Sequence, residues 1–385
     1  MSDQDMLLDG HMQVCICGGG HLAHALAAVL GARDNLRVFV LTRRPAQWRS
    51  EIVAIYRDEL ELVGRIEGAS DDPEQVIPGS GAVIFTVPAF AHEDIVVRIE
   101  PFLTPETWLG AMSGGGFPWL LERHLGPGAQ VFGVQRAPYV CRITEYGKSV
   151  SIMGIRKVLK LGARPASRAR DVGAWLGRQL NMPVCAIDNY LGVVLGNGNA
   201  VFHPARLYSL FKPGAQAKMA RCPRFYADWD LRASEVYLAC DSEIQALCQA
   251  IPLDLSGVEP VGAHFELPAA SREDAQALTR KIRHIPALQD IPAPVLGPPG
   301  DCRPDLTSRF FREDIAYGLL PIRAVAQLAE VETPAIDELL RWAQDLLGER
   351  FLLGPRLALE GLMHLPLPQS LGMTRLDDLV SWLTS

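Results

Sequence analysis

The sequence predicts an α/β fold, in which an N-terminal, doubly wound parallel sheet precedes a mainly α-helical C-terminal domain. Through the first half of the chain, short apolar runs alternate with helical patterns, as is typical of parallel strands joined by helices. A glycine-rich turn directly follows the first of these runs. After about Asp188 strand signals become rare and helical periodicity dominates. The sequence therefore predicts two domains, 1–188 and 189–385.

The apolar runs of the first half are the predicted strands, because turn residues separate them. They are Gln13–Cys17, Leu36–Leu41, Gly81–Val87, Trp108–Met112, Gln130–Val134, Ser149–Met153 and Pro183–Ile187. A helix, His21–Gly31, is predicted after the first strand. The helices predicted in the second half are Phe225–Ile251, Ser271–Arg283, Ile315–Leu328 and Thr333–Leu347. The proline-rich stretch Ile285–Pro304 predicts a long loop.

The composition is that of a globular protein. Of 385 residues, 48% are hydrophobic and 21% charged, which excludes a disordered chain. The net charge of −7 argues against a nucleic-acid partner held by a broad basic surface. No apolar run reaches the roughly 20 residues of a membrane helix, and no signal-peptide pattern opens the chain, so we expect a cytoplasmic protein without membrane contact. The eight cysteines lack Cys-x-x-Cys and zinc spacing, so we expect reduced thiols and no metal site.

The strongest local signal is the run Gly18-Gly19-Gly20-His21-Leu22-Ala23. It fits G-x-G-x-x-(G/A) and stands between a predicted strand and a predicted helix, the context of the Rossmann dinucleotide-binding turn. Gly18 allows the tight turn, Gly20 lets the backbone approach a pyrophosphate, and Ala23 allows close helix–sheet packing. The helix that begins at His21 presents its free N–H groups to the phosphates. The sequence therefore predicts a dinucleotide site here, the alternative being a purely structural turn.

The end of the second predicted strand bears on the choice of cofactor. An acidic residue that binds the ribose 2′-hydroxyl of NAD is expected there. The sequence instead reads Thr42-Arg43-Arg44, with no acid. Two arginines can hold a 2′-phosphate through charge-assisted bonds, although arginines also commonly follow a surface strand. We expect NADP(H) in preference to NAD(H), with Val87 and Pro88, at the end of another buried strand, facing the nicotinamide.

The second half contains the catalytic candidates. His203 precedes a proline at an apparent helix interruption, and Arg309 and Asp314 stand just before the apolar helix that begins at Ile315. Taken singly, each residue also has a structural interpretation. A lone histidine is more often a packing residue, the arginine could be a surface charge, and the aspartate could cap the helix.

Several separated segments, taken in order, resemble the opine dehydrogenases (the octopine/nopaline dehydrogenase family) over nearly the whole chain. Besides the glycine-rich turn, they are Ala137-Pro138-Tyr139-Val140-Cys141-Arg142-Ile143 with Tyr146-Gly147-Lys148 and Gly154, then Asn199 with Val201-Phe202-His203-Pro204, and Arg309 with Glu313-Asp314. The first is similar to the family's stretch between two late strands. The second is similar to its Asn-x-x-x-His-Pro segment, and the third to its Arg-(x)4-Asp element.

The resemblance implies an NADPH-dependent condensation of an amino acid's amine with an α-keto acid, usually pyruvate. An imine would be reduced to an N-(1-carboxyalkyl) amino acid, in a cleft between the two domains. His203 would be the general acid/base, Asp314 would orient it, and Arg309 would bind the keto-acid carboxylate. Asn199, Tyr139 and Arg142 would contact the substrates. The resemblance leaves two assemblies open, a monomer, as in some relatives, and a homodimer through the helical domain.

Two other functions remain open from the sequence. One is an NADPH-dependent 2-keto acid reductase, similar to ketopantoate reductase, which would need no amine. The other is a nucleotide-sensing Rossmann protein without turnover. A sensor has no need of a proton donor beside a carboxylate clamp, which favours an enzyme.

Overall fold

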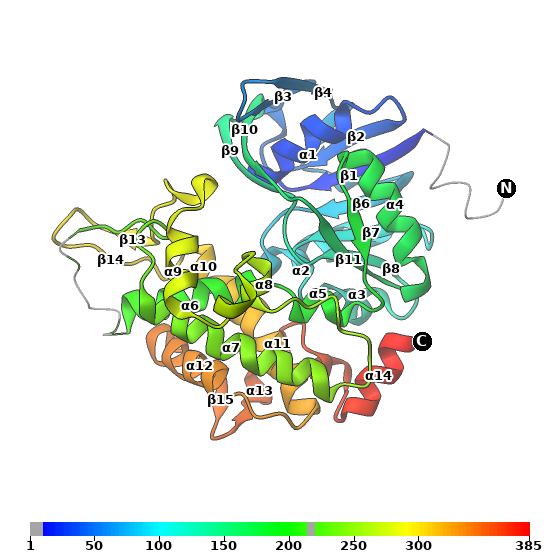
Figure 1. The fold of residues 1–385 in the computed structure, drawn as a ribbon. Coiled ribbons are helices and arrows are strands. Elements are labelled where there is room, and N and C mark those ends of the chain that lie inside the picture. The colour runs from blue at the N-terminus through cyan, green and yellow to red at the C-terminus, as the bar shows by residue number, and fades with distance from the viewer. Residues whose placement is uncertain (1–10, 213, 215–218, 220) are drawn as a thin grey trace. The chain divides into compact units, whose positions relative to one another are not determined.

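The computed structural model describes residues 11–212, 214, 219 and 221–385, and the chain divides into two compact units (Figure 1). The second unit comprises Val194–Trp382, and the first comprises the residues before it together with Leu383–Ser385. The first unit is built on a mainly parallel sheet and the second is mainly helical, which confirms the predicted fold class. In the part of the chain that is described, no helix is both long enough and apolar enough to cross a membrane.

An eight-stranded sheet forms the centre of the first unit. Its strands, in spatial order, are β12 (Val184–Ala186), β11 (Leu159–Arg164), β8 (Gln130–Val134), β7 (Trp108–Met112), β6 (Ser80–Phe85), β1 (Met12–Cys17), β2 (Leu36–Leu41) and β5 (Gly68–Ser70). All neighbouring pairs are parallel except β11 with β8. The chain reverses its direction of winding at β1, because β2 lies on one side of it and β6 on the other. Ligands of such sheets bind at the carboxyl ends of the strands at this switch point.

A separate four-stranded sheet is the main feature that the sequence did not predict. Its order is β4 (Glu61–Arg65), β3 (Glu51–Tyr56), β10 (Ser149–Ile155) and β9 (Tyr139–Glu145). The strand predicted at Ser149–Met153 is therefore present, but its assignment to the parallel sheet is wrong. Its partner β3 lies about a hundred residues away in the chain, and a pairing over that distance leaves no local signal.

Helix α1 (His21–Gly31) is buried on all sides, from Ala23 to Leu30. It contacts β2 of the large sheet and β3, β4 and β9 of the small one, so both sheets share its core. This burial explains why the helix is rich in alanine and leucine and carries no charged residue. The other helical segments before the division are η1 (Pro45–Gln47), η2 (Pro73–Gln75), η3 (Ala89–Ala91), α2 (His92–Ile99), η4 (Glu100–Phe102), α3 (Phe117–Leu125), η5 (Ala166–Arg168) and α4 (Ala169–Leu180). Helix α5 (Leu191–Leu195) crosses the division.

Helices dominate the second unit (Figure 1). They are α6 (Asn199–Phe211), α7 (Leu231–Ala250), α8 (Val261–His264), η6 (Ala269–Ser271), α9 (Ala275–Arg283), η7 (Pro286–Leu288), α10 (Arg309–Arg312), the π-helical turn η8 (Asp314–Leu319), α11 (Leu320–Leu328), α12 (Pro334–Leu347), α13 (Leu359–Leu362), η9 (Pro368–Leu371) and α14 (Leu376–Thr384), which ends across the division. Two short hairpins are β13 (Val295–Leu296) with β14 (Arg303–Pro304), and β15 (Leu352–Leu353) with β16 (Arg356–Leu357).

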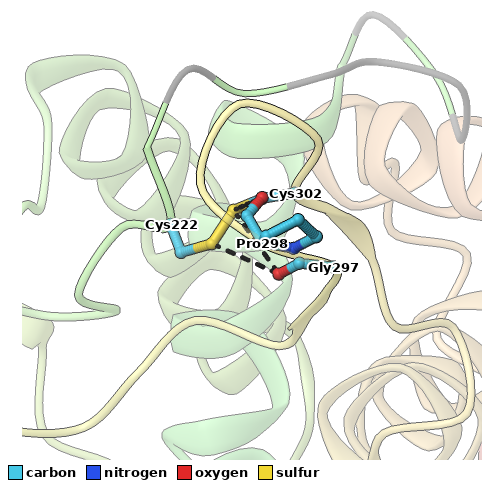
Figure 2. The surroundings of a disulfide bond; sticks show 4 residues. All are labelled: Cys222, Gly297, Pro298 and Cys302. Atoms are coloured by element: carbon cyan, nitrogen blue, oxygen red, sulfur yellow. Dashed lines mark hydrogen bonds between the residues drawn. A yellow bond between two sulfur atoms is a disulfide. The ribbon is translucent and has the colours of Figure 1, made fainter.

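Two expectations for this unit are wrong. The helix predicted from Phe225 begins only at Leu231, because the Asp230 side chain accepts the N–H of Ala233 and caps it there. The expectation that the cysteines are reduced thiols fails for one pair. Cys222 and Cys302 are joined by a disulfide, with the carbonyl groups of Gly297 and Pro298 against the sulfur atoms (Figure 2). The two cysteines are 80 residues apart, so no local spacing identifies them as a pair.

Candidate active site

His203 and Asp314 form a buried pair in the second unit. His203 lies in the middle of α6 and Asp314 begins η8, and the two side chains are 4% and 10% exposed. The imidazole Nδ1 lies 2.8 Å from a carboxylate oxygen of Asp314. A carboxylate can only accept, so Nδ1 carries the hydrogen of this bond. The aspartate therefore fixes the tautomer and the orientation of the ring.

A glycine lets the two helices come this close. A Cβ placed on Gly318 of η8 would lie 2.9 Å from the Cβ of Ala200 on α6, which is below any normal contact. One turn away on each helix stand His203 and Asp314, which therefore approach each other. The π-helical turn precedes Pro321, which has no N–H for the carbonyl of Tyr317. Single π-turns of this kind are frequent at functional sites.

Tyr226 completes a chain of three side chains. Its hydroxyl lies 2.8 Å from the Nε2 of His203, so both ring nitrogens are engaged. With the hydrogen on Nδ1 of a neutral ring, Nε2 accepts and the hydroxyl donates. Tyr226 is not among the residues predicted from the sequence, because its position falls within the helix predicted from Phe225. The signal that could have found it is the aspartate at 230, which predicts a cap and so leaves residue 226 in a loop.

Arg206 holds the loop that carries Tyr226. This arginine, also on α6, is 1% exposed. Its guanidinium donates to the carbonyl of Phe225 at 3.0 Å, to the carbonyl of Asp228 at 2.6 Å and to the carboxylate of Asp230 at 2.5 Å. Burial lowers the pKa of Arg206, and the charge of Asp230 opposes this shift. The loop is thus fixed to the same helix as His203.

Aromatic rings surround the imidazole. The ring of Phe310 meets it edge-on with centroids 4.7 Å apart, and Phe225 lies 5.6 Å away. Phe310 and Phe225 stack on each other at 4.7 Å. These rings exclude water from one side of the histidine, which strengthens its hydrogen bonds.

Arg309 begins α10, just before the turn that carries Asp314, and Asn199 begins α6, which carries His203. Arg309, the residue before Phe310, is exposed, and its guanidinium lies 5.6 Å from the Phe310 ring. Among the described residues, no carboxylate is within ion-pair distance of it. Asn199 is half-buried one turn before His203 on α6, and its side-chain amide has no hydrogen-bond partner within the described ranges. Both side chains are therefore available to a ligand.

In the first unit, the glycine-rich turn lies at the switch point of the sheet. Gly18 has a φ of 137°, and a Cβ there would be 2.5 Å from Oγ1 of Thr86 and 3.0 Å from the side chain of Val87. The turn therefore packs directly against the loop of Val87 and Pro88. A Cβ on Gly20 would meet nothing within 4 Å, so the space over the N-terminus of α1 is open. A turn of this form fits the pyrophosphate of a dinucleotide.

Three histidines support this turn and its neighbouring loop. Buried His24 donates from Nδ1 to the carbonyl of Gly20 at 2.9 Å and accepts the N–H of Gly147 at Nε2, at 2.7 Å; burial lowers its pKa. The exposed His21 accepts the N–H of Ile143 at 3.0 Å. His92 donates to the carbonyl of Val87 at 3.2 Å, and burial lowers its pKa to about 4. On the same helix as His21 and His24, Ala23, predicted to allow close packing of the helix on the sheet, is fully buried in the core.

Of the residues predicted for the adenosine end, Thr42 and Arg44 lie near Tyr146. Thr42 is buried, and Arg43 and Arg44 are exposed. The guanidinium of Arg44 lies 5.6 Å from the Tyr146 ring. A Cβ on Gly19 would be 2.5 Å from the Tyr146 hydroxyl and 2.7 Å from Oγ1 of Thr42, so these groups meet beside the turn. Tyr146 is a second residue of the candidate site that was not predicted from the sequence.

Tyr139 and Arg142 lie in β9 of the first unit. Tyr139 is 7% exposed within the hydrophobic core, and burial raises the pKa of its hydroxyl. Arg142 is half-buried and donates to the carbonyl of Cys141 at 2.9 Å. Their predicted contact with substrate stays a prediction.

The chain is similar to known dehydrogenases over nearly its whole length. The family model of the NAD/NADP octopine/nopaline dehydrogenase α-helical domain matches residues 186–347. Octopine dehydrogenase of Pecten maximus is 28% identical over 96% of this chain and 99% of its own. The uncharacterized protein y4xO of Sinorhizobium fredii is 30% identical over 88% of this chain and 96% of its own. A solved octopine dehydrogenase with NADH and L-arginine is 27% identical and covers 97% of this chain and 98% of that one, with a TM-score of 0.81.

Proposed function

The chain belongs to the octopine/nopaline dehydrogenase family and is an oxidoreductase that acts on CH–NH groups, and we propose that it condenses an amino acid with an α-keto acid. The keto acid is pyruvate and the reductant NADPH. The product is an N-(1-carboxyalkyl) amino acid. The observation that carries the proposal is the buried His203–Asp314 pair. Arg309 lies on α10, directly before η8, and its guanidinium has no carboxylate partner in the described part of the chain.

His203 acts as the general acid and base. The amine must lose a proton before it attacks the keto carbon, and the resulting hydroxyl must gain one before it leaves as water. An imidazole serves both steps near neutral pH. Asp314, at 2.8 Å from Nδ1, keeps the ring in one tautomer and stabilises the imidazolium that forms in between.

Arg309 binds the carboxylate of the keto acid. A guanidinium offers two parallel N–H donors to a planar carboxylate, which orients the keto group as well as holding it. Asn199, one turn before His203 on the same helix face, donates to the same substrate from its amide. The amino acid itself is left open, because arginine, a simple apolar amino acid and an acidic chelator precursor all supply the required amine.

NADPH binds in the first unit. Gly18 and Gly20 accommodate its pyrophosphate at the N-terminus of α1, where His21 begins the helix and Ala23 packs it on the sheet. Thr42, Arg43 and Arg44 hold the 2′-phosphate, and Val87 and Pro88 contact the nicotinamide ring. When bound there, the cofactor supplies the hydride that reduces the imine. The exposed arginines and the absence of an acid after β2 support NADPH over NADH.

The remaining expectations follow from this assignment. Residues 1–188 form the NADP(H)-binding domain, and residues 189–385 form the substrate and catalytic domain. We expect a cytoplasmic enzyme whose partners are its small-molecule substrates, either as a monomer or as a homodimer through the helical domain. A disulfide such as that between Cys222 and Cys302 is rare in a reducing compartment. Whether these two cysteines are oxidised or reduced in cells therefore tests the cytoplasmic location.

The deciding experiment is NADPH oxidation with pyruvate, measured with and without a panel of amino acids and diamines. Oxidation only in the presence of both substrates is expected, and the best amine identifies the second substrate. Oxidation with keto acid alone would assign the protein to the 2-keto acid reductases instead. Tight NADPH binding without turnover on any pair would favour the sensor.

A further inference from the structure

The hydroxyl of Tyr226 is hydrogen-bonded to Nε2 of His203, the imidazole nitrogen through which a general acid/base would exchange its proton. Asp314 holds Nδ1 of His203, and the Tyr226 hydroxyl holds Nε2 at 2.8 Å. With both nitrogens engaged, a proton leaves or reaches this ring through the tyrosine hydroxyl. We propose that Tyr226 is the group that exchanges the proton with the substrate, at the end of a chain Asp314–His203–Tyr226. The proposal rests on the proposed function, since it concerns the proton steps of that reaction.

The surroundings of Tyr226 fix it in place. Its ring packs on Phe202 with centroids 5.4 Å apart, and Phe202 precedes His203 on α6. The guanidinium of Arg206 holds the carbonyl of Phe225, directly before the tyrosine, and two further groups of the same loop. The ring contact with Phe202 and the hydrogen bonds from Arg206 to the loop together keep the Tyr226 hydroxyl at the imidazole. Such fixed geometry lowers the cost of reorganisation during proton transfer.

The proton steps balance with this chain. The ammonium of the amino acid gives a proton to the Tyr226 oxygen while the hydroxyl proton passes to Nε2, which leaves a free amine and an imidazolium paired with Asp314. The amine adds to the keto carbon, and its excess proton moves to the alkoxide to give a carbinolamine. Tyr226 then donates its proton to the carbinolamine hydroxyl and is reprotonated from Nε2. Water leaves with the C–O electron pair, the nitrogen lone pair forms the C=N bond, and His203 is neutral again.

Tyr226→Phe tests this assignment, because it removes the hydroxyl and keeps the ring. The matched control is Tyr208→Phe, which removes a hydroxyl from a buried tyrosine on α6 whose partner is Glu338. We expect a fall in kcat of roughly 10²-fold or more for Tyr226→Phe, with little change in the dissociation constant of NADPH. We expect Tyr208→Phe to keep nearly the full kcat. A kcat of Tyr226→Phe equal to that of the control would overturn the proposal.

Arg206 provides the test of positioning. Arg206→Lys keeps the charge and loses the fork that binds two carbonyls and a carboxylate. It should lower kcat about 10-fold in the wild type and hardly at all when Tyr226→Phe is already present, since the hydroxyl it positions is gone. An equal loss of kcat in the wild type and in Tyr226→Phe would show that Arg206 does not act by positioning the Tyr226 hydroxyl.

Nitrogen NMR of the His203 ring separates this proposal from the proposed function. The resonance, assigned through its loss in His203→Asn, should report an Nε2 that accepts a hydrogen bond in the wild type and in Tyr208→Phe. In Tyr226→Phe it should shift downfield. No shift would overturn the pairing whatever the enzyme does. A further outcome is a resonance that depends on Tyr226 in a protein that turns over no pair of substrates. That result would overturn the proposed function and the role of Tyr226 in proton exchange, and would leave only the hydrogen bond between Tyr226 and His203.

Discussion

Ala200 of α6 and Gly318 of η8 face each other so closely that a Cβ on the glycine would lie 2.9 Å from the Cβ of Ala200. This contact sets the distance between the two helices that supply His203 and Asp314. Gly318→Ala should therefore separate them. We expect a loss of about 1–3 kcal/mol in the free energy of unfolding and a fall in kcat of about 10-fold to 100-fold. Urea unfolding and steady-state kinetics measure the two effects.

Ala200→Gly combined with Gly318→Ala is the control for that variant. It removes the methyl group that the new one would meet, so part of the kcat should return, although glycine in α6 costs about 1 kcal/mol in stability. If Gly318→Ala alone has the kcat of the wild type, the contact does not control the position of Asp314.

His203→Asn removes the proposed acid/base, while the new amide can still donate to Asp314. We expect a fall in kcat of roughly 10²–10⁴-fold, because no other group at this position can carry the proton. NADPH affinity, followed by fluorescence titration, should stay nearly the same, since the glycine-rich turn belongs to the first unit. Unchanged turnover would exclude His203 from the mechanism.

Arg43→Ala and Arg44→Ala should each weaken NADPH binding about 10-fold, because a charge-assisted bond to a phosphate is worth about 1.5 kcal/mol or more. NADH lacks the 2′-phosphate, so its affinity should hardly change. The control is Arg37→Ala, which removes an exposed arginine of β2 whose guanidinium lies over Phe39. An equal loss for NADPH and NADH would show that neither arginine contacts the 2′-phosphate.

His92 makes stability depend on pH. Its pKa in the folded protein is lowered by burial to about 4, from 6.5. The unfolded chain therefore binds the proton more readily, and the stabilising contribution is complete above pH 6.5 and is lost as the pH falls toward 4. The loss amounts to about 3 kcal/mol at most. Free energies of unfolding measured between pH 7 and pH 4 should fall more steeply in the wild type than in His92→Gln.

The glutamine variant keeps a donor in the place of Nε2 but does not titrate in this range. Its stability still falls with pH, because carboxylates elsewhere titrate. Parallel curves for the two proteins would mean that His92 does not contribute.

The sequence was sufficient wherever the signal was local. Helix α1, strands β2, β7 and β8 and the turn at Gly18 have the predicted bounds, because periodicity and glycine conformation act over a few neighbouring residues. The two-part fold class also follows from local patterns, and the family from several short segments taken in order. The second sheet could not be predicted in the same way, since β3 pairs with β10 across about a hundred residues.

The candidate site likewise has a part that local sequence signals predict and a part that depends on long-range contacts. By itself the sequence identified His203, Arg309 and Asp314 as the candidates for the chemistry, and it predicted where a dinucleotide turn begins. Only the tertiary structure decided that Tyr226 meets His203, that Arg206 holds its loop and that Cys222 joins Cys302. These contacts depend on how helices pack and where loops return, and packing is set by the shapes of residues far apart in the chain.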